Sequence, residues 1–314
     1  MSQASNPGGE RRPPRASRRE AAPDSAQSDL FARALAGSPA PRPDPAGEIV
    51  RRRPGPIRVG TSGYSFLDWV GPFYPSGTPR RAMLDHYRRV FSAVEVNSTY
   101  SRLPPPSTMQ RMAERTPPDF QFTAKLPGEL THGRDRQIGP ADGFRRTVAP
   151  LEEAGKFVGA LAQFPFSFRR TQDAEENLDW LHQALPETPL FVEFRHGSWD
   201  TPELEEMLRG KGLGFCSVDE PRLPGLIPQK ALLTGETAYV RLHGRNGRDW
   251  WGGGSERYNY LYRKEELEEW AQVIRELSTQ AHRTYIFFNN CHAGHAVANA
   301  RMMEELLGLE PDRG

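Results

Sequence analysis

The stretch "LFVEFRHGSWDTPELEEMLRGKGLGFCSV", residues 190–218, contains the pattern that decides the fold. Residues 190–195 alternate in the manner of a β-strand, and residues 213–218 form a second apolar run. Residues 201–212 between them have helical composition, with Thr201 as the predicted N-cap, a proline at the first helical position and glycines near the end. A strand, a helix and a strand in so short a segment indicate a parallel β-α-β unit.

The same rhythm runs through the rest of the chain. Strand-like runs occur at residues 57–60, 91–97, 120–125, 157–164, 190–195, 213–218, 238–242 and 284–290. Helical patterns precede the second, third, fifth, sixth and eighth runs, and another closes the chain. An open doubly wound sheet is the alternative, but "VGTSGYSFLDW" after the first strand lacks the GxGxxG spacing of a dinucleotide site. The pattern therefore predicts a TIM-type (β/α)8 barrel.

The first part of the chain differs in composition from the remainder. Residues 1–55 hold ten Arg against six acidic residues, are rich in Pro, Ser and Ala, and nearly lack large apolar residues. Such a segment cannot bury enough apolar surface to offset its ordering entropy. We predict a disordered tail at 1–55 and a single domain at 56–314. Arg51 to Arg53 could touch a phosphate backbone, although a solubilising tail is the better interpretation.

Whole-chain features exclude several classes of protein. No run approaches the roughly 20 apolar residues of a membrane helix, so no membrane partner is predicted. The start of the chain has no apolar segment typical of a secretory signal. Cys216 and Cys291, the two cysteines, are far apart, which indicates a reducing compartment without a disulfide framework. A cytoplasmic protein is predicted.

Most of the predicted strands have one apolar face and one face that becomes polar toward the carboxyl end. The polar positions are Glu95, Asn97, Lys125, Gln163, Glu193, Arg195, Ser217, Asp219, Arg241, His243 and Asn289. In a barrel this face is the interior at the mouth, where enzymes of this fold perform their chemistry. Unpaired buried charges cost several kcal/mol each, so we expect the charged members to compensate one another. The network either lines a functional cleft or is purely structural.

Several segments resemble one known family. They include "VEVNSTYSRLP" (94–104), "VEFRHGSW" (192–199) and "AYVRLHGRN" (238–246). The chain resembles the YecE-like family, the domain of unknown function numbered seventy-two, over residues 56–310. The resemblance implies a TIM-barrel-like fold and no settled activity, with a suggested kinship to abasic-site endonucleases. Family-like positions that coincide with the polar face are Glu95, Asn97, Lys125, Glu193, Arg195, Arg241, His243 and Asn289.

Two features were weighed as metal sites. A metal-dependent phosphodiesterase needs several His, Asp and Glu residues at the strand ends, but here Lys and Arg compete for the same space. We predict no metal site and no cofactor, with a single Mg²⁺ or Mn²⁺ as the open alternative. "CHAGH" (291–295) resembles a soft-metal cluster, but no other Cys or His pair completes a tetrahedral set. We interpret it as the loop that opens the final helix.

Aromatic residues are concentrated in the predicted loops at the mouth. The loop after the first strand carries Tyr64 and Trp69, Tyr100 follows the second strand, and "WWGGGSERYNYLY" (250–262) follows the seventh. These rings could stack on bases or sugars, or they could seal the rim of the barrel. Arginines at 245 and 248 favour an anionic ligand.

These observations predict a protein that binds a phosphorylated small molecule or a nucleic acid, with phosphodiester hydrolysis as its candidate reaction. Lys125, Arg195 and Arg241 would bind the anion. The catalytic candidates are Glu193 and His243, with Glu95 and Asp219 as further carboxylates. Additional ligand contacts are predicted for Asn97, Tyr100, Tyr64, Trp69, Gln163 and Asn289. The alternatives are a glycosidase-like hydrolase that acts through Glu193 and a second carboxylate, and a non-catalytic metabolite-binding or scaffold protein. The sequence gives no indication for or against protein partners.

Overall fold

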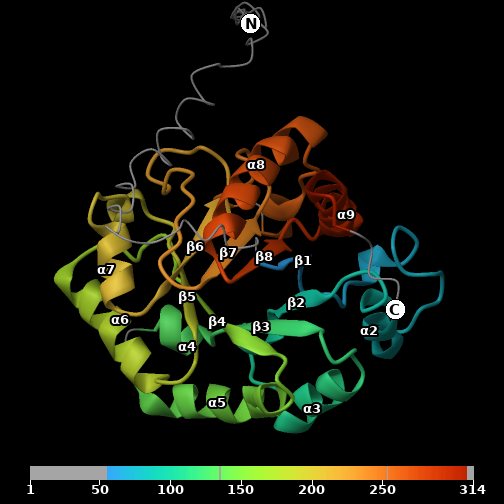
Figure 1. Cartoon of the computed structure of the whole chain (residues 1–314), viewed down its shortest axis with the longest axis horizontal. Coiled ribbons are helices and arrows are strands. Elements are labelled where there is room, and N and C mark those ends of the chain that lie inside the picture. The colour runs from blue at the N-terminus through green and yellow to red at the C-terminus, as the bar shows by residue number, and fades with distance from the viewer. Residues whose placement is uncertain (1–54, 134–135, 253, 310–314) are drawn as a thin grey trace, which may run out of the picture. The chain divides into compact units, whose positions relative to one another are not determined.

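The computed structural model describes residues 55–309 except 134–135 and 253. In this part of the chain eight parallel strands pair in sequence order and close into a barrel, because β8 also pairs with β1 (Figure 1). The strands are β1 (Ile57–Ser62), β2 (Ala93–Val96), β3 (Gln121–Lys125), β4 (Phe157–Gln163), β5 (Leu190–Glu193), β6 (Gly214–Asp219), β7 (Thr237–Leu242) and β8 (Arg283–Phe288). The predicted TIM-type barrel is confirmed.

Helices surround the barrel and bury the apolar outer faces of its strands (Figure 1). They are α2 (Arg80–Tyr87), α3 (Pro106–Glu114), α4 (Gly128–Thr131), α5 (Ile138–Glu153), α6 (Gln172–Ala184), α7 (Leu204–Gly210), α8 (Lys264–Gln280) and α9 (His295–Leu307). Residues 220–236, which connect β6 to β7, contain no helix. One of the eight β-α units is therefore incomplete.

Two helical predictions differ from the structure. The predicted N-cap at Thr201 is wrong, because α7 begins at Leu204 with Glu203 at the cap position. Helix α5 was not predicted between the third and fourth strands. Its sequence, "IGPADGFRRTVAPLEE", contains two glycines and two prolines, which disfavour a helix locally, but five of its residues are buried against neighbouring elements. Tertiary packing stabilises this helix against its local propensity.

Three further predictions concern the N-terminal tail, membrane-spanning helices and the two cysteines. The predicted tail at 1–55 lies, apart from Gly55, outside the described residues. None of the helices in the described part of the chain is long and apolar enough to cross a membrane. Cys216 and Cys291 are both free thiols.

Candidate functional site

The centre of the barrel contains a buried guanidinium between two carboxylates. Arg241 of β7 is 2% exposed and forms ion pairs with Glu95 Oε1 of β2 at 2.7 Å and with Glu193 Oε2 of β5 at 2.5 Å. Tyr239, two residues earlier on β7, donates a hydrogen bond to Glu95 Oε2 at 2.6 Å. These contacts join strands that are not neighbours in the barrel. The predicted charge compensation among Glu95, Glu193 and Arg241 is present.

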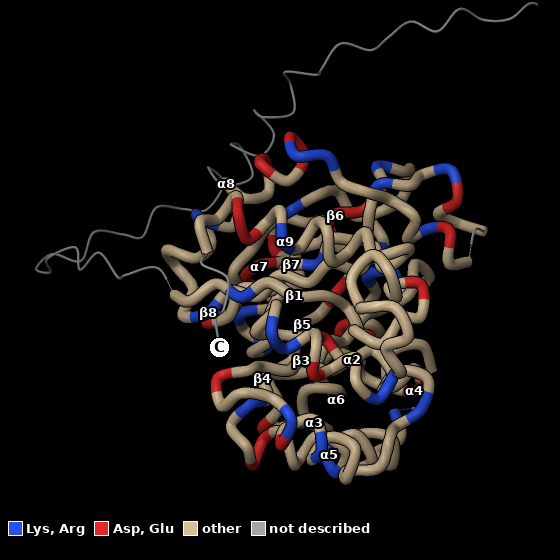
Figure 2. Tube along the Cα trace, turned by 90° about the vertical axis from the view of Figure 1, so that its right-hand side faces the viewer, with Lys and Arg blue, Asp and Glu red and all other residues tan. Residues whose placement is uncertain are grey.

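A second guanidinium lies nearer to the mouth. Arg195, which follows β5, forms ion pairs with Glu193 and with Glu220, and its side chain is 12% exposed. The ring of Trp250 lies 5.4 Å from its guanidinium carbon. Arg195 is therefore the more accessible of the two arginines inside the barrel. In the tube of Figure 2, positions of both charge signs occur in the central part of the fold, near the strand labels, as well as in the peripheral helices and loops.

His243 is held as a neutral imidazole. Asn289 Nδ2 lies 2.8 Å from its Nδ1, while Arg195 Nη2 at 3.0 Å and Glu193 Oε1 at 3.3 Å both lie near its Nε2. Burial, and then the nearby Arg195, lower the pKa of His243 to about 3. Arg195 and Arg241 also hold the pKa of the buried Glu193 carboxyl well below its usual range. Near neutral pH, Glu193 is ionised and His243 is uncharged.

Of the three cations inside the described barrel, Lys125, at the end of β3, is the one without an ion pair. Its Nζ donates to Gln163 Oε1 at 2.7 Å and lies 4.0 Å from the centre of the Tyr100 ring. Among the described residues, no carboxylate lies within 4.0 Å of this nitrogen. Burial, and then the positive charge of Arg241, lower the pKa of Lys125 to about 8. The lysine is thus still mainly protonated at pH 7.

The predicted register of β6 is wrong. Ser217 and Asp219 were expected inside, but Asp219 accepts a hydrogen bond from Trp270 of α8, on the outside of the barrel, at 3.0 Å. Ser217 Oγ accepts a hydrogen bond from the backbone of Leu232. Cys216 Sγ instead lies 3.7 Å from Glu193 Oε2, in the interior. A shift of one residue moves a strand's whole inward set to the other face, so Asp219 is excluded from the site.

The corrected register brings Glu220 into the site, a residue that the sequence analysis missed. Its side chain is 4% exposed and its Oε2 contacts Arg195. Burial is the main cause that raises the pKa of Glu220, to about 7, although Arg195 acts in the opposite direction. The signal in the sequence was the position of Glu220 two residues after Val218, on the face that appears apolar.

The aromatic residues have two different roles. Trp69 is fully buried and its Nε1 donates to Cys291 O at 2.7 Å. The ring of Tyr64 lies 6.0 Å from that of Tyr87 on α2, outside the barrel wall. These two residues seal the rim and do not join the charged cluster. Tyr100 does join it, through its contact with Lys125.

The remaining predicted residues lie close to the cluster or outside it. Gln163 accepts a hydrogen bond from Lys125, and Asn289 contacts the ring of His243. Asn97 is half-buried, and its Oδ1 has no hydrogen-bond partner among the described residues. Arg245 does not face the mouth, since it pairs with Asp219 and Glu266 on the outer side. We use the name mouth cluster for five charged or titratable groups at the carboxyl ends of the strands. They are Lys125, Glu193, Arg195, Glu220 and His243.

Metal-ligating residues do not converge in the described part of the chain. No group of three or more His, Cys, Asp or Glu residues there could hold a metal ion. In the mouth cluster, the carboxylates already contact guanidinium groups. His292 lies in a short turn and His295 begins α9, so the "CHAGH" segment is the loop that opens the final helix, as predicted.

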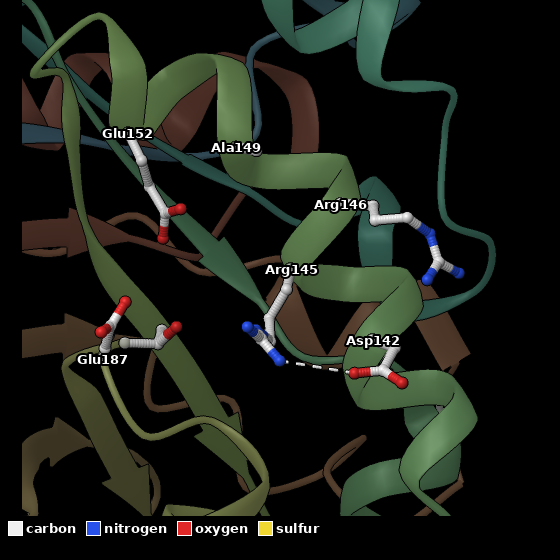
Figure 3. A pocket seen from close by; sticks show the side chains of 7 residues that line it. Asp142, Arg145, Arg146, Ala149, Glu152 and Glu187 are labelled. Carbon is white, nitrogen blue, oxygen red and sulfur yellow. Dashed lines mark hydrogen bonds and ion pairs between the residues drawn. The ribbon is translucent and has the colours of Figure 1, made fainter.

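A separate hollow of about 380 Å³ lies on the outer surface beside α5 (Figure 3). It is lined by residues of α5 and by Glu187 and Thr188, which precede β5 and so lie at the amino end of the strands. Arg145 contacts Asp142 at 3.4 Å, and both signs of charge are present. The hollow contains none of the predicted site residues.

The geometry defines a class of protein: a parallel β/α barrel with a polar, charge-paired interior that opens at the carboxyl ends of its strands. Residues 58–313 match the family described as "Protein of unknown function DUF72". The chain belongs to this family, which confirms the resemblance found in the sequence.

Individual relatives agree with this assignment. The UPF0759 protein YunF of Bacillus subtilis (strain 168) is 30% identical in an alignment of 272 positions that covers 81% of this chain and 95% of that protein. The crystal structure of a DUF72 family protein from Thermotoga maritima MSB8 is 43% identical, covers 81% of this chain and 99% of its own, and has a TM-score of 0.76. A DUF72 family protein from Enterococcus faecalis V583, 24% identical over 82% of this chain and 97% of its own, has the same fold with a TM-score of 0.74.

Proposed function

We propose that the mouth cluster binds a small phosphorylated ligand, with Lys125 as the principal anchor of the phosphoryl group. The observation that carries this proposal is the lysine that lacks a carboxylate partner. Lys125 is partly buried, and a cation withdrawn from water is costly unless it is paired, so a ligand anion would supply the missing charge. Arg195, the more exposed guanidinium, offers a second contact of the kind that favours phosphate.

The charge of the folded domain favours a small ligand over nucleic acid. Residues 56–314 carry 31 basic and 34 acidic residues. A protein that binds the phosphate backbone of nucleic acid usually presents a basic surface, and this domain has no net positive charge. A single phosphoryl group needs only the local field of two cations.

Phosphodiester hydrolysis is the candidate reaction of this site, and its acid–base roles differ from those predicted first. Glu193 contacts two guanidinium groups and stays ionised, and His243 is neutral, so both are better suited to holding Arg195 and Arg241 than to transferring protons at neutral pH. A general acid or base works best with a pKa near the working pH. Glu220, with its pKa of about 7, meets that condition.

The glycosidase alternative has less support. It requires Glu193 to act as a free nucleophile or base beside a second carboxylate. Both oxygens of Glu193 are engaged by arginines, and Glu95 is engaged by Arg241 and Tyr239. Binding without turnover is the other outcome, and the experiment below separates it from hydrolysis.

The test is calorimetric titration of the full chain with inorganic phosphate and ribose 5-phosphate at pH 7. Lys125→Met should weaken binding at least tenfold, because a buried charged hydrogen bond is worth about 1.5–3 kcal/mol. Lys264→Met is the matched control, since Lys264 on α8 is 64% exposed and lies outside the barrel. A wild-type protein that binds neither compound, or a Lys125→Met variant that binds equally well, would refute the proposal.

Turnover is tested separately with a labelled duplex that contains an abasic site and with a phosphodiester analogue of the bound ligand. Each is incubated with the full chain, with and without Mg²⁺ or Mn²⁺. Cleavage that Glu220→Gln abolishes would support hydrolysis in the mouth. Binding of the small phosphates without cleavage would leave a binding protein. Duplex binding that survives Lys125→Met would place any nucleic-acid contact outside the mouth cluster.

A further inference from the structure

We infer that Glu220 is an internal competitor of the ligand: its carboxylate occupies Arg195 when ionised, and its protonation frees this guanidinium for an incoming anion. The inference rests on the proposed function of the mouth cluster, and it assigns to that site a proton-dependent control. It concerns a residue that follows β6 and faces the interior from the carboxyl end of the barrel.

Two carboxylates share the guanidinium of Arg195. Its guanidinium lies between two carboxylates, with Nη2 on Glu193 Oε1 and Nη1 on Glu220 Oε2. Its 12% exposure exceeds the 2% of Arg241, so a ligand that enters the mouth meets Arg195 before the deeper arginine. Any anion that binds Arg195 has to share it with, or take it from, one of the two carboxylates.

The two carboxylates are not held equally. Glu193 also pairs with Arg241 at 2.5 Å and lies 3.3 Å from His243 Nε2. Among the described residues, Glu220 has Arg195 as its one cation within 4.0 Å, and its buried Oε1 has no hydrogen-bond partner. Loss of Arg195 would therefore leave Glu193 paired but would leave Glu220 without a counter-ion. Glu220 is the partner that a ligand displaces.

The barrel interior contains equal numbers of cations and carboxylates. Lys125, Arg195 and Arg241 are the cations, and Glu95, Glu193 and Glu220 are the carboxylates. With every group ionised, this set has no net charge and offers an anion little attraction. Protonation of one carboxylate leaves one positive charge. Oε1 of Glu193 and Oε1 of Glu220 both lack a hydrogen bond, but Glu193 pairs with two arginines and Glu220 with Arg195 alone among the described residues, so Glu220 is the member suited to take that proton.

The groups that surround Glu220 agree with this assignment. The charged and titratable groups around the Arg195–Glu220 pair are Glu193 from β5, Asp219 from β6, Arg241 from β7, His243 after β7 and Tyr258 in the following loop. His243 is neutral and Asp219 is paired on the outer side, so Arg195 supplies the favourable charge. Burial, together with Glu193, raises the pKa of Glu220 to about 7. The control would thus operate near neutral pH.

The binding of an anion to Arg195 and the binding of a proton to Glu220 should therefore be thermodynamically linked. If only the protonated form leaves Arg195 free, the apparent affinity scales with the protonated fraction of Glu220. With a pKa of about 7, that fraction falls about tenfold between pH 6 and pH 8. Anion affinity should fall by the same factor, and binding at pH 7.5 should take up protons from the buffer.

The experiment titrates the full chain with sulfate, because the charge of sulfate does not change between pH 6 and pH 8. Wild-type protein should bind about tenfold more tightly at pH 6 than at pH 8. At pH 7.5, calorimetry in two buffers with different ionisation enthalpies should show proton uptake. Glu220→Gln should bind at pH 7.5 about as tightly as wild type at pH 6, with a flat profile between these two values. Glu236→Gln is the matched control, since Glu236 before β7 is 81% exposed.

The outcomes distinguish the two proposals. Sulfate binding that depends on Lys125 but keeps its pH profile in Glu220→Gln would overturn the inference and leave the proposed function intact. Absence of sulfate binding in every protein at every pH would overturn both. The proton uptake of the wild type needs no variant, so the inference stays testable if Glu220→Gln does not fold. Any pH dependence left in Glu220→Gln above pH 7.5 belongs to Lys125, whose pKa is about 8.

Discussion

Asp219 and Glu220 are neighbours in the chain but lie on opposite sides of the barrel wall. Asp219 accepts hydrogen bonds from Arg245 at 2.9 Å, from Tyr262 Oη at 2.5 Å and from Trp270 Nε1 at 3.0 Å. Glu220 faces the interior, where Arg195 contacts one oxygen and the other oxygen has no partner. Both side chains are almost fully buried. They differ in how completely their charge is satisfied.

The difference between Asp219 and Glu220 distinguishes a carboxylate that stabilises the fold from one that belongs to the proposed site. A buried carboxylate whose acceptors are all used rigidifies the fold, because each donor around it depends on it. Most buried polar groups in native proteins are satisfied in this way, and each exception needs an explanation. The unused acceptor of Glu220 and the unpaired charge of Lys125 lie in the same cluster. The ligand proposed above would satisfy both.

The largest effect is expected from Asp219→Ala. The variant leaves Arg245, Tyr262 and Trp270 without their shared acceptor, and breaking a buried ion pair costs about 3–5 kcal/mol. Urea unfolding at pH 7 measures this loss of unfolding free energy. Glu269→Ala is the control, because Glu269 is 54% exposed and lies 3.9 Å from Arg245. A loss below 1 kcal/mol would remove the contrast between the two carboxylates.

Glu220 should make stability depend on pH in the opposite sense to an ordinary salt-bridged carboxylate. Its pKa rises from 4.5 to about 7 on folding, so the folded state binds this proton more tightly than the unfolded state. The stabilisation is full below pH 4.5 and is lost as the pH rises through 7. Between pH 5 and pH 8 the difference in unfolding free energy between wild type and Glu220→Gln should change by about 2 kcal/mol. Parallel pH profiles of the two proteins would contradict the assignment.

Lys125→Met should stabilise the protein without ligand by about 1 kcal/mol at pH 7. The pKa of Lys125 is lowered on folding from 10.5 to about 8, so the unfolded state holds the proton more tightly and the charged lysine opposes folding below pH 8. The lost hydrogen bond to Gln163 offsets part of the gain. Unfolding curves at pH 7 and pH 10 should show the advantage of the variant shrinking at the higher pH. A variant less stable than wild type at pH 7 would mean that Lys125 is structural.

The smallest effect is expected from Arg248→Ala. Arg248 is 89% exposed, and its ion pair with Asp249 at 3.2 Å is of the kind that contributes less than about 1 kcal/mol. Unfolding free energy should change by less than about 0.5 kcal/mol, and phosphate binding should be unchanged. Binding weakened as much as in Lys125→Met would show that the mouth extends to this loop and would enlarge the proposed site.

The fold was predictable because its signals are local. Eight runs of alternating residues, separated mainly by helical patterns, predict the strands and their parallel order without knowledge of any distant contact. Helix α5 was missed because its glycines and prolines obscure the helical pattern, and its buried face is revealed by packing alone. The inward faces of β2, β3, β5 and β7 were also predicted correctly, since on each of these strands the polar residues share one face.

The prediction failed at β6, where polarity was a misleading guide. In "FCSVDE" the face with Ser217 and Asp219 is the more polar, but Asp219 is satisfied by donors of α8 and the loop before it. Those donors lie 26 to 51 residues further along the chain. No local pattern contains them, so the sequence placed the wrong carboxylate in the site.

The sequence by itself determined the barrel and most of the residue types that line its mouth, because alternation along a strand is a property of adjacent residues. The tertiary structure decided which charge pairs with which, which carboxylate has an unused acceptor, and the direction of each pKa shift. Arg241 meets Glu95 across 146 residues of chain, and Arg195 meets His243 across 48. Electrostatic energies depend on these distances and on burial, and both exist only when the barrel is closed.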